Sequence, residues 1–349
     1  MGPHSASSTP GPAALGRGGT DPTVTDALLI LGLIDPANYL GGRQSIDPAL
    51  ARAAVTEKVA DTLGWDVTAS ASGIHDIVVA NMANAVRPVS VGPGLDPRSF
   101  VFVAYGGTLP LLAGQIADRL DIPEVVIPEN SSAFSALGLH GADFLLKSDR
   151  TVGWPLADTG RIAEINATVD ALAEEARSAI RSEGFADSDI GFRRSADLRF
   201  QGQIFELSLP LPDRPLTVED LPGIAADFHA LYEETYGAGT VWRGAGVLML
   251  NVSVTVVGRR EHRSPFREQE AEAEPFAPEP VATRTVHLPM TGQQAQVPVY
   301  SAADLTPGAR AQGPEIVDEG DTTIFTPPGH GLRRDRFFNY VLSREGVTR

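Results

Sequence analysis

FVFVAYGGTLPLLAGQIADRL, residues 100–120, decides how the first part of this chain folds. A run of apolar, β-forming residues meets the pair Gly106-Gly107 and then continues in a pattern typical of an amphipathic helix. Because glycine has no Cβ, the pair lets the backbone approach a neighbour closely, and that neighbour is either a nucleotide or another part of the fold. Short glycine signatures often occur by chance, so this stretch alone favours a tight strand-to-helix turn.

The flanking segments place this turn in an α/β fold. Apolar residues recur at helical spacing over about residues 47–63 and 72–87, and Pro88 is expected to end the second helix. After the glycine pair, EVVIP predicts a buried strand and AFSALGLHGADFL a further helix. This order indicates a parallel or mixed sheet covered by helices. In such sheets ligands bind at the carboxyl ends of strands, where the glycine pair lies.

The second half of the chain has a different pattern of predicted helices and strands. An Ala- and Glu-rich helix is expected over about residues 151–182, followed by the strand ADLRFQGQIFELSLPLP, a helix in VEDLPGIAADFHALYEETYG and a strand in VLMLNVSVTVVG. Short β-rich segments near the end suggest a small sandwich or barrel-like cap. We therefore expect an α/β domain in 1–150, an α+β domain in 151–258, a charged, solvated linker in 259–280 and a β-rich C-terminal domain in 281–349.

Composition narrows the class of protein. The net charge of −16 disfavours nucleic acid and anionic membranes as partners, because both attract Lys and Arg. The absence of cysteine excludes disulfides and thiolate chemistry, and suits a reducing compartment. We find neither an apolar run of membrane-spanning length nor a secretory signal, and expect a cytoplasmic protein. The Gly-, Pro- and Ser-rich stretch over residues 1–19 is typical either of the middle of a domain or of a flexible tail.

Several stretches, taken in order and spacing, resemble the C-terminal half of the ATPase subunit of the hydantoinase A, 5-oxoprolinase and ketone (acetone and acetophenone) carboxylase family. The similarity runs over nearly the whole chain. The stretches are PGPAALGRGGTDPTVTDA, LGLIDPANYLGGR, ANMANAVRPVSVGPGLDPRSFVFVAYGG, FSALGL, FQGQIFELSLPLP, YGAGTVWRGAGV and GARAQGPEIVDEGDTTIFTPPG.

The resemblance implies that residues 1–150 form the C-terminal part of an actin-like ATPase core, related to sugar kinases and heat-shock chaperones. Gly106, Gly107 and Thr108 would then lie on the adenosine side of bound ATP. Members of this family phosphorylate the amide oxygen of a lactam or imide, or the enolate oxygen of a ketone. Phosphorylation converts a poor leaving oxygen into a good one before hydrolysis or carboxylation.

Departures from the family pattern point to partners. Members carry two upstream glycine-rich loops with aspartates that hold the phosphates and the metal, and this sequence contains neither loop. We therefore expect an N-terminal-half ATPase subunit and a hydantoinase B-like subunit as partners. ATP with Mg²⁺ or Mn²⁺ is expected in the assembled complex, and none bound by this chain alone. The histidine that usually follows the glycine pair is Leu112, and the usual Cys-Tyr pair is Ala14-Leu15.

Other candidate site residues each have a structural alternative. Asp26 is a catalytic candidate that could equally cap a helix. Arg243 could contact substrate or simply lie on the surface. Arg87 could contact phosphate, or pair as a helix-end arginine with a carboxylate such as Asp96. The histidines, among them His75, His140 and His330, lack metal-ligand spacing, so no metal site is expected.

Two hypotheses for function remain open. In the first, the chain is a subunit of an ATP-dependent cyclic amide hydrolase or ketone carboxylase that is inactive alone and contributes the adenosine-side lobe. In the second, it is a non-catalytic structural subunit of such a complex, as the apolar residues at positions 14 and 112 suggest. The substrate, whether lactam, imide or ketone, does not follow from the sequence.

Overall fold

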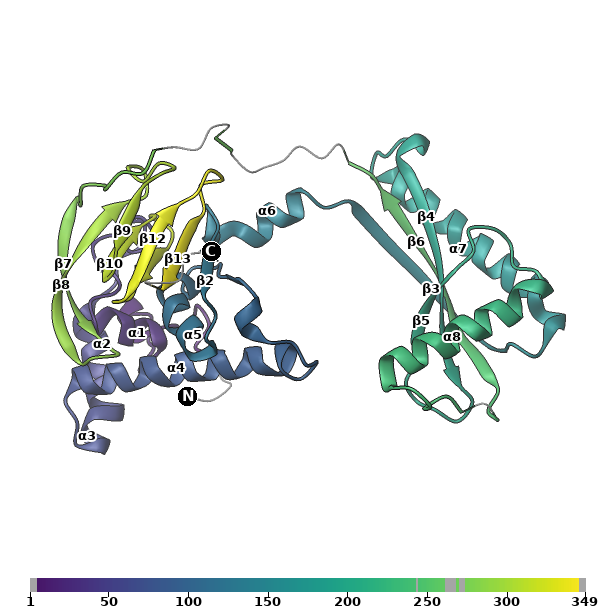
Figure 1. The fold of residues 1–349 in the computed structure, drawn as a ribbon, viewed down its shortest axis with the longest axis horizontal. Coiled ribbons are helices and arrows are strands. Elements are labelled where there is room, and N and C mark those ends of the chain that lie inside the picture. The colour runs from purple at the N-terminus through teal and green to yellow at the C-terminus, as the bar shows by residue number, and fades with distance from the viewer. Residues whose placement is uncertain (1–4, 243, 261–267, 270–273, 345–349) are drawn as a thin grey trace. The chain divides into compact units, whose positions relative to one another are not determined.

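The computed structural model describes residues 5–242, 244–260, 268–269 and 274–344. The chain divides into two compact units (Figure 1), and each is described by itself. Unit 1 comprises Met1–Leu139 and Ser264–Arg349, and unit 2 comprises His140–Arg263. The C-terminal segment therefore returns to the unit in which the chain begins.

Helices form one layer of unit 1. They are α1 (Val24–Ile30), α2 (Pro48–Val55), α3 (Asp61–Leu63), α4 (Val67–Ser90), α5 (Ala113–Leu120) and α6 (Phe134–His140), with a π-helical turn η2 (Thr56–Ala60) between α2 and α3 and 3₁₀ turns η1 (Ala13–Leu15), η3 (Pro97–Ser99), η4 (Leu109–Leu111) and η5 (Ser131–Ala133). The helical pattern over 47–63 is confirmed. Pro88 does not end α4, because a missing N–H so near the end removes only one helical hydrogen bond.

A five-stranded mixed sheet crosses unit 1 in the order β1-β2-β13-β12-β9. Its strands are β1 (Phe102–Val103), β2 (Glu124–Ile127), β9 (Arg310–Gln312), β12 (His330–Arg334) and β13 (Tyr340–Arg344). β1 and β2 are parallel, whereas β13 is antiparallel to β2. Residues 281–349 therefore form no separate domain: three of their strands complete a sheet that the first part of the chain begins.

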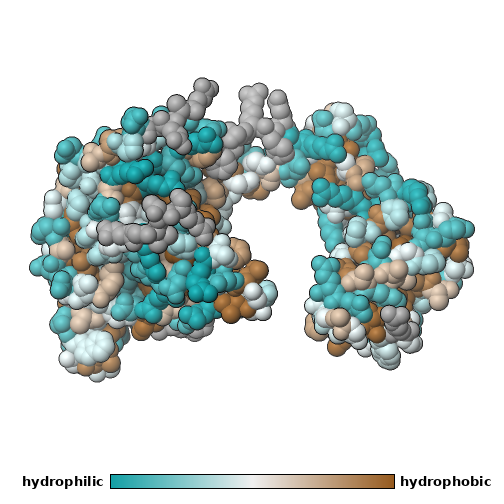
Figure 2. Space-filling view, in the orientation of Figure 1, coloured by the Kyte–Doolittle hydropathy of each residue, from teal (hydrophilic) through white to brown (hydrophobic). Residues whose placement is uncertain are grey.

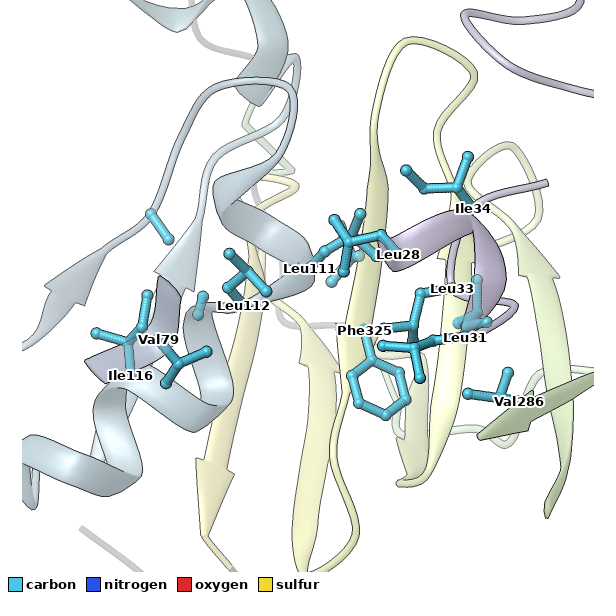
Figure 3. Packing of buried hydrophobic residues seen from close by; sticks show 14 of the residues in the cluster. Leu28, Leu31, Leu33, Ile34, Val79, Leu111, Leu112, Ile116, Val286 and Phe325 are labelled. Carbon is cyan, nitrogen blue, oxygen red and sulfur yellow. The ribbon is translucent and has the colours of Figure 1, made fainter. Parts of the chain in front are cut away.

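The other strands of this segment form a four-stranded sheet in the order β11-β10-β8-β7. They are β7 (Ala282–Leu288), β8 (Gln293–Ser301), β10 (Glu315–Asp318) and β11 (Thr323–Thr326). One core joins both sheets to the helices, and Figure 3 shows Leu28 beside Leu111 and Phe325 beside Leu33. Burial of this shared apolar surface is the main free energy that holds the C-terminal strands to the N-terminal helices.

Unit 2 packs two long helices on an antiparallel sheet of order β3-β6-β4-β5. Its elements are β3 (Phe144–Pro155), η6 (Thr159–Arg161), α7 (Ile162–Ser182), η7 (Asp187–Asp189), β4 (Ile190–Phe200), β5 (Leu207–Leu211), η8 (Val218–Asp220), α8 (Leu221–Tyr236) and β6 (Val247–Gly258). The α+β prediction is confirmed here. Two details differ. The helix expected from about residue 151 begins at Ile162, because residues 144–155 form the strand β3. The single strand predicted over 196–212 is instead two antiparallel strands, the end of β4 and the whole of β5.

The N-terminal stretch over 1–19 and the predicted linker over 259–280 both contain residues that pack or pair with unit 1. Ala13 and Ala14 are buried, so this part of the N-terminal stretch belongs to the core rather than to a flexible tail. Within the predicted linker, Phe276 forms a β-bridge with Ala309. Residues 261–267 and 270–273 of that linker lie outside the described residues.

Candidate functional site

The glycine pair forms a sharp bend between β1 and η4. Gly106 has φ +105°, a conformation that side chains strongly disfavour, and its N–H donates to the Ser131 carbonyl at 2.8 Å. Gly107 differs, because its φ is not in this region and a Cβ there would meet no described atom within 4 Å. The turn therefore requires Gly106, whereas Gly107 leaves open space beside the backbone.

A loop from the other end of the chain holds this bend. Thr322, in the turn between β10 and β11, donates its hydroxyl to the Gly107 carbonyl at 2.9 Å. Thr322 is 5% exposed, so the hydrogen bond is shielded from water. This contact is not predicted from the sequence, although the polar run DEGDTT between two apolar strands is a signal for a functional turn.

A cavity of about 100 Å³ opens beside Gly107 and Thr108. It is lined by Thr25, Ile34, Asp35, Asn38, Tyr39, Leu40, Gly107, Thr108, Leu111, Asp318, Gly320, Asp321, Thr322 and Thr323. Its charged lining residues are carboxylates, and no Lys or Arg of the described chain is among them. Hydrogen-bond acceptors suit the hydroxyl and amino groups of a nucleoside better than they suit phosphate.

Each lining carboxylate already has a partner. Arg284 donates to Asp35 at 3.0 Å, the Asn38 amide donates to Asp318 at 2.6 Å, and Arg43 forms an ion pair with Asp321. Among the described residues, His, Asp and Glu side chains form no group of three that could hold a metal.

A buried charged cluster adjoins this loop. Burial raises the pKa of Glu319, and the Arg334 guanidinium, the Tyr340 hydroxyl and the Asn130 backbone oppose that rise. Arg334 lies 3.6 Å above the Tyr340 ring and 3.9 Å from Glu129. Burial also raises the pKa of Tyr340, and the negative charge of the nearby Glu319 raises it further. The cluster joins the β10–β11 turn to β12 and β13, and so gives the loop a rigid support.

Asp26 is buried in the core of unit 1 and does not line the cavity beside Gly107. It is 0% exposed, and its two oxygens accept hydrogen bonds from the N–H groups of Ala13 (3.2 Å), Ala14 (2.8 Å) and Thr23 (2.8 Å). The Thr23 hydroxyl donates to it as well, at 2.8 Å. The Asp26 N–H in turn donates to the Thr23 hydroxyl oxygen at 3.3 Å, and together with the bond from the Thr23 N–H this forms a capping box for α1. The geometry favours the structural alternative for this residue.

The two apolar replacements are core residues. Leu112 is 0% exposed and lies with Val79 and Ile116 (Figure 3). Ala14 is 1% exposed and belongs to the same cluster. Neither side chain is exposed at the cavity beside Gly107.

The remaining candidates are dispersed. Asp96 pairs with Arg98 at 2.8 Å, not with Arg87, which forms no ion pair with any residue that the structure describes. Arg243 lies outside the described residues. His75 is buried in α4, and burial lowers its pKa. His330 is buried at the start of β12, 3.2 Å from Asp118, whereas His140 ends α6.

Comparison with known protein families shows to which family this chain belongs. The hydantoinase/oxoprolinase family model matches residues 1–148, and the hydantoinase/oxoprolinase C-terminal domain model matches residues 157–342. The chain belongs to the hydantoinase/oxoprolinase family. The C-terminal match begins after β3 and ends within β13, so it includes most of unit 2 and the strands that return to unit 1.

Two relatives of this chain are named as enzyme subunits. The chain is 29% identical over 345 residues to the caprolactamase alpha subunit of Pseudomonas jessenii, which covers 98% of this chain and 49% of the relative. It is 32% identical over 346 residues to the acetophenone carboxylase gamma subunit of Aromatoleum aromaticum, covering 96% of this chain and 46% of the relative. The chain thus spans about half the length of each of these two relatives.

Solved structures of the family have the same fold. The crystal structure of the ATP-dependent caprolactamase from Pseudomonas jessenii matches with a TM-score of 0.72 at 29% identity, over 99% of this chain and 50% of that chain. A nucleotide-free acetone carboxylase structure matches with a TM-score of 0.77 at 23% identity, over 98% and 49% respectively. None of the helices in the described part of this hydantoinase/oxoprolinase family member has the length and apolar character needed to cross a membrane.

Proposed function

We propose that this chain contributes the adenosine-side portion of an ATP-dependent enzyme that hydrolyses a cyclic amide or carboxylates a ketone. The observation that carries the proposal is the open space beside Gly107, in a cavity whose polar lining includes carboxylates, hydroxyls and the Asn38 amide. Thr322 and Ser131 hold the glycine loop in place from two sides. The relatives and matching structures support the reaction class, since they include an ATP-dependent caprolactamase and ketone carboxylase subunits.

The size and charge of the cavity support a nucleotide site that this chain shares with a second polypeptide. Small-molecule sites usually have volumes of about 300–1,000 Å³, and this cavity has about 100 Å³. Its described lining also provides no cation for phosphate groups. We infer that a second polypeptide, equivalent to the half of the relatives that this chain does not span, supplies the phosphate and metal contacts. We expect a hydantoinase B-like subunit to complete the complex.

An exposed apolar patch supports a protein partner. It lies at the C-terminal end of α4 and in the segment leading to the edge strand β1, where Figure 2 shows hydrophobic surface. The patch comprises Val89 (71% exposed), Val91 (56%), Leu95 (47%), Phe100 (46%), Val101 (44%) and Val103 (47%). Large exposed apolar patches usually mark interfaces. We assign it to the polypeptide that supplies the remaining half of the nucleotide site.

The experiment compares Gly107→Val with wild type in the assembled complex. Calorimetry measures the affinity for ATP and, separately, for adenosine, while thermal unfolding measures stability. We expect Gly107→Val to abolish binding of both ligands with little change in melting, because no described atom occupies the space of the new side chain. Gly223→Val, at an equally open glycine in unit 2, is the matched control and should bind normally. Normal adenosine affinity in folded Gly107→Val would refute the adenosine-side role.

A non-catalytic structural role is the second candidate. The burial of Leu112 and Ala14 favours it, because these positions offer no polar group for chemistry. Steady ATP turnover by the reconstituted complex that disappears with Gly107→Val would exclude this alternative. Turnover that is indifferent to Gly107→Val would favour it instead. The chain purified alone is expected to show no ATP turnover above a buffer blank.

A further inference from the structure

A second cavity in unit 1 lies beside β9 and β12, neighbouring strands at one edge of the five-stranded sheet (Figure 1). Its volume is about 510 Å³, and it shares no lining residue with the cavity beside Gly107. Its charged lining residues are Arg310, Arg333, Arg334, Arg336, Glu274 and Asp335. Arginines therefore outnumber carboxylates here, although the chain as a whole carries a net charge of −16.

Two of these arginines face each other across the sheet. Arg310 of β9 and Arg333 of β12 are directly opposite in the antiparallel register. Like charges in directly opposite positions destabilise a strand pair, unless a counter-charge lies between them. The pair is therefore a place where an anion would stabilise the fold.

The described carboxylates do not neutralise Arg310. Arg333 approaches Glu124 at 3.3 Å, and Arg336 approaches Glu268 at 3.6 Å. Arg310 forms no ion pair with any residue that the structure describes. Glu274 lines the same cavity, yet it lies beyond ion-pair distance of the described arginines.

The other carboxylate that lines the cavity, Asp335, accepts the hydrogen bonds of a turn. Asp335 accepts hydrogen bonds from the N–H groups of Phe337 (2.9 Å) and Asn339 (2.8 Å), and from the Asn339 amide (3.0 Å). The Arg310 N–H donates to the Phe276 carbonyl at 2.9 Å, which holds residue 276 at the edge of β9. Backbone hydrogen bonds therefore order two segments next to the cavity.

We propose that this cavity binds a small, doubly charged oxyanion, with Arg310 and Arg333 as its principal contacts. The planar guanidinium group has donors in a fixed fork that matches the oxygens of phosphate and carboxylate groups. A phosphate group and a small dicarboxylate share this chemistry. The site is separate from the proposed nucleotide site and does not depend on it.

Isothermal titration calorimetry on the full chain tests the proposal, with inorganic phosphate and succinate titrated separately against a sodium chloride control of matched ionic strength. We expect saturable binding of at least one anion, and which one binds identifies the ligand as a phosphate or a dicarboxylate. Arg310→Gln and Arg333→Gln should each weaken binding at least about tenfold. Arg52→Gln, which removes the same charge from an exposed position on α2, should bind as wild type does.

Stability without the anion provides an independent readout. Because Arg310→Gln removes repulsion from Arg333, this variant should melt at or above the wild-type temperature in anion-free buffer. Three results would overturn the proposal. They are the absence of saturable binding of either anion, an equal loss of affinity in Arg52→Gln, and a lower melting temperature of Arg310→Gln in anion-free buffer.

Discussion

Thr322 donates its hydroxyl to the Gly107 carbonyl at 2.9 Å, across 215 residues of sequence. The contact ties the turn between β10 and β11 to the glycine loop that follows β1. It is shielded from water, since Thr322 is 5% exposed. The position of the glycine loop therefore depends on a residue close to the other end of the chain.

Thr322→Val should loosen this loop. Valine has nearly the same shape but leaves the Gly107 carbonyl without its donor, so we expect a loss of ~1 kcal/mol in the free energy of unfolding. In the assembled complex, adenosine affinity should also fall. Thr322→Ser keeps the hydroxyl and should restore most of the affinity. Urea unfolding and calorimetry give the two values, and a valine variant with unchanged adenosine affinity would contradict the positioning role.

Gly106→Ala should destabilise unit 1 where Gly107→Ala does not. The φ of +105° at Gly106 is strained for any residue with a Cβ, which corresponds to about 2 kcal/mol. The neighbouring Gly107 has neither this strain nor a steric conflict with described atoms. Thermal unfolding of the two variants under identical conditions checks this. Equal stability of both variants would mean that the bend relaxes freely.

Asp26→Asn should reduce stability by about 3 kcal/mol, because the amide replaces one accepting oxygen with a donor that faces other donors. Asp21→Asn, at an exposed neighbouring position, is the matched control and should change little. Chemical unfolding measures both. If Asp26→Asn retained wild-type stability but abolished turnover by the complex, Asp26 would be a catalytic residue after all.

Glu315 should make stability depend on pH. Burial raises its pKa from 4.5 to about 7, while a 2.9 Å hydrogen bond from the Thr326 hydroxyl partly opposes the rise. Since the folded state holds the proton more tightly than the unfolded state, this contribution is full below pH 4.5 and is lost as pH rises through 7. The loss amounts to at most about 3 kcal/mol.

Glu315→Gln should remove this dependence. The variant should exceed wild type in stability at pH 8 and approach it at pH 5, as measured by urea unfolding at both values. Glu175→Gln, on the exposed face of α7, should retain the wild-type pH dependence. Parallel pH profiles for wild type and Glu315→Gln would show that another group is responsible.

Val89→Asp and Val91→Asp should weaken partner binding without unfolding the chain. Both side chains are more than half exposed, so a charge there changes stability by only about 0.5 kcal/mol. In the proposed interface the same charge would have to be desolvated, and we expect at least about tenfold weaker association. Light scattering after size exclusion measures the complex. Leu63→Asp, at a 52% exposed position in α3, should leave association unchanged, and an equal effect would argue against this surface.

The sequence alone determined most of the local structure. Apolar periodicity predicted helices over 47–63 and 72–87, because helices depend on near neighbours along the chain. The second helix, α4 (Val67–Ser90), is longer than predicted at both ends. The quoted family stretches identified the family, which the two family matches confirm. The assignment of Gly106, Gly107 and Thr108 to a nucleotide remains a prediction.

Only the tertiary structure decided what lies around those residues. Nothing in residues 281–349 indicates that β13 pairs with β2, because strand pairing depends on packing across the whole core rather than on local pattern. The same packing brings Thr322 to Gly107, encloses Asp26 among backbone donors, and sets Arg310 opposite Arg333. Polar residues of this kind look like ordinary turn or surface residues in the sequence, and burial and distant partners give them their roles.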